Sequence, residues 1–112
     1  MERHLFVRRI ADRLKAAERS TDANIAAVAE LIREMTSERA AAGFAAHAGH
    51  KALVNCISAL GQLSETRARL IQAHDRLATD AEAFGIPTSA MGPLEDKDAR
   101  PTTGLKGVAA AA

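Results

Sequence analysis

The chain has 112 residues, enough for one small domain with a modest core. It carries 15 Lys and Arg against 14 Asp and Glu, and this balance excludes both a strongly basic nucleic-acid-binding protein and an acidic disordered one. With Cys56 as the single cysteine, a disulfide framework within the chain is excluded, and we expect a reducing, cytoplasmic location. No apolar stretch is long enough to cross a bilayer.

Composition favours helices over strands. Alanine is the commonest residue, tryptophan and tyrosine are absent, and all three prolines follow residue 86. We therefore predict an all-α protein built as a long antiparallel helical hairpin. It has two long helices, or three if the first one breaks, and oligomerisation completes it to a helical bundle.

The first helix is predicted over residues 2–48, within a hairpin domain that spans residues 1–84. Its apolar periodicity changes register near Thr21, which a continuous helix absorbs as a stutter. Residues 20–22 are all good N-cap types, so a break there is the alternative. The apolar positions are Val7, Ile10, Leu14 and Ala17, followed by Ile25, Val28, Ile32 and Met35.

Two glycines mark the chain reversal between the helices. Gly43 and Gly49 lie in a stretch of small residues, and we place the turn near Gly49.

On an unbroken helix His47 and His50 would share a face and supply two metal ligands, but no third ligand stands at a supporting position. We therefore expect no metal and no cofactor.

The second helix, residues 51–84, has the strongest pattern in the chain. Its apolar positions alternate steps of three and four, as in a helix that packs along another helix. We call these positions the seam: Leu53, Cys56, Leu60, Leu63, Leu70, Leu77 and Phe84. Gly85 stands where a left-handed C-cap ends a helix, and Pro87 prevents its continuation.

Additional residues modify this seam. Val54, Ile57 and Ile71 widen the apolar surface and indicate contact with more than one neighbouring helix. Arg67 and His74 stand at seam positions, where polar groups either fix the register and the choice of partner or mark the solvated end of the packing.

Residues 85–112 are predicted to form a flexible tail rich in Pro, Gly and Ala. Its last residues, 107–112, resemble the small apolar C-terminal tags that bacterial unfoldase-proteases of the AAA+ class recognise. A low-complexity end without a role is the alternative. Replacing Ala111 and Ala112 by aspartate would lengthen the half-life of the protein if the end is such a tag.

We expect a non-enzymatic interaction protein, an adaptor, chaperone-like protein or scaffold, that uses the seam to bind a second copy or another helical protein. In length and alanine-rich helices it is similar to bacterial phasins and small export chaperones. The alternative is a regulator whose basic surface, Arg8, Arg9 and Arg13, binds an anionic membrane or nucleic acid. No paired carboxylates, nucleophile with a base or phosphate cradle points to an enzyme or to a small-molecule substrate.

Overall fold

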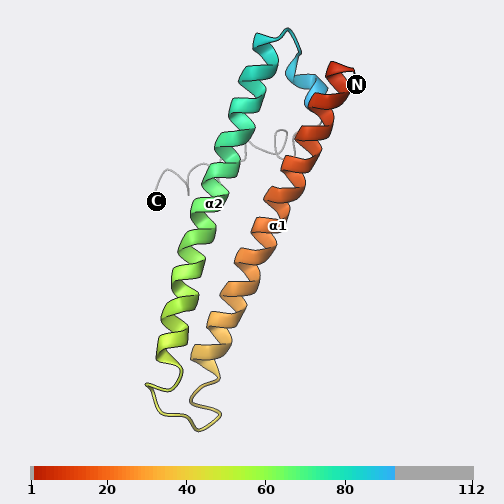
Figure 1. Ribbon diagram of the computed structural model, residues 1–112. Coiled ribbons are helices and arrows are strands. Elements are labelled where there is room, and N and C mark those ends of the chain that lie inside the picture. The colour runs from red at the N-terminus through yellow and green to blue at the C-terminus, as the bar shows by residue number, and fades with distance from the viewer. Residues whose placement is uncertain (1, 93–112) are drawn as a thin grey trace, which may run out of the picture.

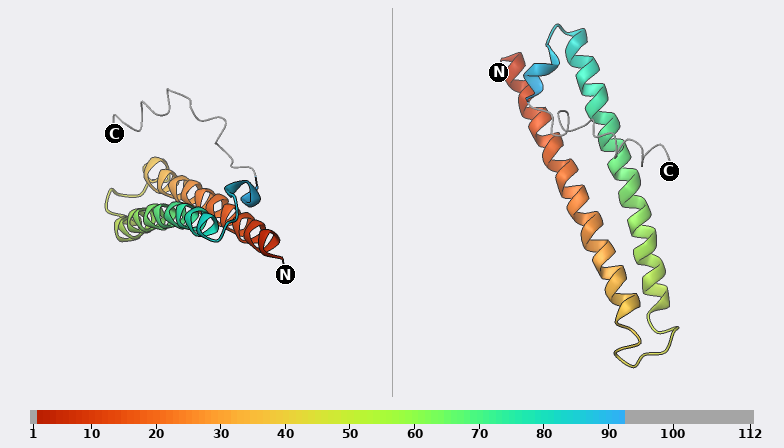
Figure 2. Two further views of the ribbon diagram at one scale, coloured as in Figure 1. Left: turned by 90° about the horizontal axis from the view of Figure 1, so that it is seen from above. Right: turned by 180° about the vertical axis from the view of Figure 1, so that it is seen from behind.

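The computed structural model describes residues 2–92, which form an antiparallel helical hairpin (Figure 1). Helix α1 spans Arg3–Ser37, α2 spans His50–Ala83, and a short 3-10 helix, η1, spans Thr88–Met91. The two long helices run side by side, and η1 lies against α1 near its N-terminal end (Figure 2). This arrangement confirms the predicted all-α hairpin.

Glu2 caps the N-terminus of α1. Its carboxylate accepts hydrogen bonds from the backbone N–H groups of His4, at 2.7 Å, and Leu5, at 3.1 Å. These bonds satisfy amides that have no partner within the helix. The hydrogen bond from the His4 amide is the main reason that the pKa of Glu2 is lowered from its ordinary value.

α1 runs without a break through residues 20–22, so the first helix is continuous and the alternative of two shorter helices is not observed. Thr21 is buried at the change of register, and its hydroxyl donates to the carbonyl oxygen of Ala17 at 2.9 Å. The acceptor, the Ala17 carbonyl oxygen, belongs to the same helix. The polar side chain of Thr21 is therefore accommodated inside a continuous helix and does not need to act as the N-cap of a new one.

The predicted end of the first helix is wrong. α1 ends at Ser37, eleven residues before the expected residue 48, and the connection occupies residues 38–49. The apolar periodicity stops at Met35, so further helix would bury little against α2. Gly43 and Gly49 take φ values of 85° and 75°, which permit two changes of direction.

α2 ends as the sequence predicts. Gly85 has a φ of 77°, its N–H donates to the Glu82 carbonyl, and the Ile86 N–H donates to the Ala81 carbonyl at 2.8 Å. These two bonds form a Schellman motif. Ile86 and Ala81, the two positions that usually make an apolar contact in this motif, are both buried.

The first part of the predicted tail is packed. Residues 85–92 turn back over the open end of the hairpin, and Met91 is only 2% exposed. Lys15 holds this turn by donating from Nζ to the Met91 carbonyl at 3.2 Å. The prediction of a flexible tail is wrong for residues 85–92, because Ile86 and Met91 are isolated apolar residues that form no periodic pattern in the sequence. The rest of the tail, including the tag-like end, lies outside the described residues.

The buried core is small and lies at the open end. Among the described residues, the buried hydrophobic side chains are Ala11, Ala81, Ile86 and Met91. The apolar residues along the rest of the hairpin are half-buried or exposed. A single hairpin therefore covers its apolar surface only in part.

Replacing Met91 by alanine tests the packing of η1. We expect M91A to lower the free energy of unfolding by about 2–3 kcal/mol, because it empties a buried site. Urea unfolding followed by circular dichroism measures this loss. The control S89A changes an exposed residue of the same turn and should have almost no effect. Equal stability of the two variants would contradict the packed turn.

Candidate functional site

The seam of α2 faces α1 in the same chain. Six of its seven residues are half-buried, and the Sγ atom of Cys56 lies 3.9 Å from the Sδ atom of Met35 across the hairpin. Phe84, the seventh, is 70% exposed. The seam thus packs internally over most of its length, and its binding of another molecule stays a prediction.

Both polar seam residues meet acidic partners on α1. Arg67 Nε lies 2.7 Å from Asp22 Oδ1, and His74 Nδ1 lies 3.8 Å from Glu18 Oε2. The Arg67 and Asp22 side chains are about half exposed, and such pairs contribute roughly 0–1 kcal/mol. The paired residues are four apart on α1 and seven apart on α2, so these contacts alone do not decide between the register interpretation and the solvated one.

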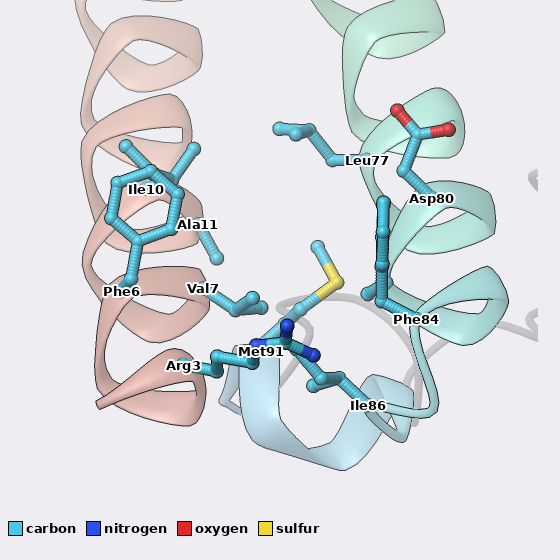
Figure 3. A pocket seen from close by; sticks show the side chains of 11 residues that line it. Arg3, Phe6, Val7, Ile10, Ala11, Leu77, Asp80, Phe84, Ile86 and Met91 are labelled. Atoms are coloured by element: carbon cyan, nitrogen blue, oxygen red, sulfur yellow. The ribbon is translucent and has the colours of Figure 1, made fainter. Parts of the chain in front are cut away.

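An apolar groove opens between the helices at the end where the chain begins (Figure 3). It has a volume of about 460 Å³. Met91 of η1 points into it between the two helices, and Phe6 and Ile10 line it from α1. Leu77 of α2 and Phe84, the C-cap residue of α2, line it from the other side. Among residues 2–92, the charged side chains that line it are Arg3 and Asp80. We call this feature the open-end groove.

The basic residues Arg8, Arg9 and Arg13 are not among the residues that line this groove, but they lie close to Phe6 on α1. Arg8 pairs with Asp12 at 3.3 Å and lies against Gly92, whereas Arg9 and Arg13 are exposed. Arg9 and Arg13 follow Phe6 by three and seven residues, which places them on the same side of α1. The basic surface and the groove are therefore neighbours, a juxtaposition that the sequence analysis missed.

A second hollow, of about 520 Å³, lies at the loop end of the hairpin. Met35, Phe44 and Leu53 line it, and Phe44 is 62% exposed. Exposed apolar side chains are therefore present at both ends of the molecule.

The two histidines considered as metal ligands do not share a helix, because His47 lies in the loop and His50 opens α2. Within residues 2–92, no group of three His, Cys, Asp or Glu side chains is placed to hold a metal ion. None of the helices in this range is long and apolar enough to cross a membrane.

Comparisons with protein-family models, with curated proteins and with solved structures gave no match to this chain.

A double-mutant cycle tests the cross-helix pair of Arg67 and Asp22. From the variants R67A, D22A and the double variant we expect a coupling free energy of about 0.5 kcal/mol that falls with added salt. The matched control replaces R67A by R69A, an exposed arginine two residues further along α2. Equal coupling of Asp22 to both arginines would contradict a specific pair.

Proposed function

We propose that the protein is a non-enzymatic interaction protein that binds an acidic amphipathic helix of a partner protein in the open-end groove. The observation that carries this proposal is the groove itself, which is apolar and open at the surface. Phe6 and Phe84, which line it, are 54% and 70% exposed. An exposed apolar surface rimmed by charge is typical of a site for another macromolecule.

The shape of the groove suits a helix. It lies between two helices, and an amphipathic helix binds such a site by inserting apolar side chains spaced three or four residues apart. Leu77 of α2 and its C-cap residue Phe84, seven residues further on, would contact successive apolar side chains of that helix. The partner's polar side would remain in water.

Charge favours an acidic partner. The half of the hairpin that holds the groove, residues 2–20 and 66–92, has nine Lys and Arg against six Asp and Glu. Arg9 and Arg13 stand beside Phe6 and would lie along the polar side of the bound helix. Complementary charge of this kind accelerates association and excludes partners of the wrong sign.

The same geometry weakens the alternative of membrane binding. A basic amphipathic helix binds a bilayer by inserting its apolar side. In α1, Val7, Ile10 and Leu14 are at least half-buried in the hairpin, which leaves Leu5 and Phe6 as the exposed apolar residues near the basic surface. A partner helix therefore accounts for more of this surface than a lipid headgroup layer does.

A pair of synthetic helical peptides tests the proposal. Both have leucine on one side, and the other side carries glutamate in the first peptide and lysine in the second. We expect calorimetry to show binding of the glutamate peptide alone. F84A should weaken it about tenfold, because most of a phenylalanine contact is lost. L31A, which removes an exposed apolar residue far from the groove, is the control.

The charge-reversed variant R9E/R13E should bind the glutamate peptide more weakly and the lysine peptide more strongly. Equal binding of both peptides by the unmodified protein would contradict the charge argument. Binding to anionic phospholipid vesicles without binding to either peptide would overturn the proposal and support the membrane alternative.

A further inference from the structure

α2 carries a second line of residues, beside the seam, that is exposed throughout. Its members follow alternating steps of four and three, so they lie along one side of the helix. Between a histidine at one end and an aspartate at the other, all members are uncharged. We call this line the outer stripe: His50, Val54, Ile57, Gly61, Ser64, Ala68, Ile71 and Asp75.

Gly61, near the middle of the outer stripe, has no evident role within the chain. A glycine inside a helix costs about 1 kcal/mol relative to alanine. A Cβ atom added at Gly61 would meet nothing within 4 Å, so packing within the described chain does not require glycine there. Close approach of a second helix gives this glycine a function, because the absence of a side chain lets two backbones come together.

The outer stripe is complementary to itself when a second copy runs antiparallel. With the two-fold axis between Gly61 and Ser64, Gly61 of one copy lies level with Ser64 of the other. Val54 then lies level with Ile71, and Ile57 with Ala68. The centre of the contact would be formed by small side chains and its two ends by bulky apolar ones. Both copies contribute the same surface, as a two-fold dimer requires.

The ends of the outer stripe carry matching polar groups in this register. Asp75 of each copy lies level with His50 of the other, at the N-terminus of α2. That terminus has no side-chain cap and no acidic residue in its first turn. A carboxylate beside it would interact favourably with the helix dipole and with a protonated histidine.

Overall charge favours the same orientation. The loop half of the hairpin, residues 21–65, has three Lys and Arg against five Asp and Glu, whereas the groove half has the positive excess described above. Antiparallel association places the acidic half of each copy beside the basic half of the other. Parallel association would bring halves of like charge together.

α1 presents small residues on the same side of the hairpin. Asp22 and Ile71 line one surface hollow, which places this part of α1 beside the outer stripe. Ala26 and Ala29 follow Asp22 by four and seven residues, so they continue that side, and both are exposed. The α1 helices of two copies would therefore meet through alanines.

From these observations we infer that two copies of the chain associate antiparallel through their outer stripes and form a four-helix bundle. The groove residue Phe84 and the turn η1 follow Asp75 in the chain, beyond the end of the contact. The dimer therefore carries its two open-end grooves at opposite ends. This inference concerns a different surface from the proposed function and does not depend on it.

Two charge variants of neighbouring residues test the dimer. Sedimentation equilibrium of the full chain should give twice its mass of 11.8 kDa. G61E places a carboxylate at the centre of the contact and should give the monomer mass, whereas Q62E, which adds the same charge one residue away, should remain a dimer. A monomeric unmodified protein, or a dimeric G61E, would overturn the inference.

Circular dichroism should show that G61E keeps its helices, since the added side chain meets nothing in its own chain. G61E should also still bind the glutamate peptide. The two proposals can therefore fail independently, because the mass of the protein tests the dimer and binding of the glutamate peptide tests the groove.

Cross-linking tests the register and the orientation. In a C56A background, V54C and I71C are prepared separately and then mixed under mild oxidation. We expect a disulfide-linked dimer from the mixture and almost none from either variant alone, because residues 54 and 71 lie level only in the antiparallel register. Self-cross-linking of V54C would show a parallel pair and would contradict the proposal, as would a mixture that forms no disulfide.

Discussion

The main constraint on this molecule is that each helix of a two-helix hairpin can cover only one side of its neighbour. The described residues form an extended hairpin of two helices, so their buried core is small. The four buried hydrophobic residues are all at the open end. The remaining apolar surface is covered only if another helix packs on it.

The same constraint applies to the contact between α1 and α2. Over most of the hairpin the seam is only half-buried, so the apolar packing between the two helices is incomplete. The pairs of Arg67 with Asp22 and His74 with Glu18 join the two helices in the observed alignment. Their contribution to stability is modest, because the Arg67 and Asp22 side chains are about half exposed to water.

Much of the fold was predictable because it depends on local periodicity. The boundaries of α2, its glycine cap and the continuity of α1 follow from residues close together in sequence. The early end of α1 was not predicted, because alanine-rich residues 38–49 favour helix locally, whereas the apolar periodicity stops at Met35 and Gly43 and Gly49 take positive φ values. The open-end groove was not predicted either, since it forms when Met91 folds back between the helices, a contact without a sequence pattern.

The most direct test of this account is the concentration dependence of thermal unfolding of the unmodified chain. If association of two copies covers the exposed apolar surface, unfolding is coupled to dissociation. The midpoint temperature should then rise as protein concentration increases. A midpoint that is independent of concentration over a hundredfold range, together with no binding of hydrophobic dye, would contradict the account, because the isolated hairpin would then be self-sufficient.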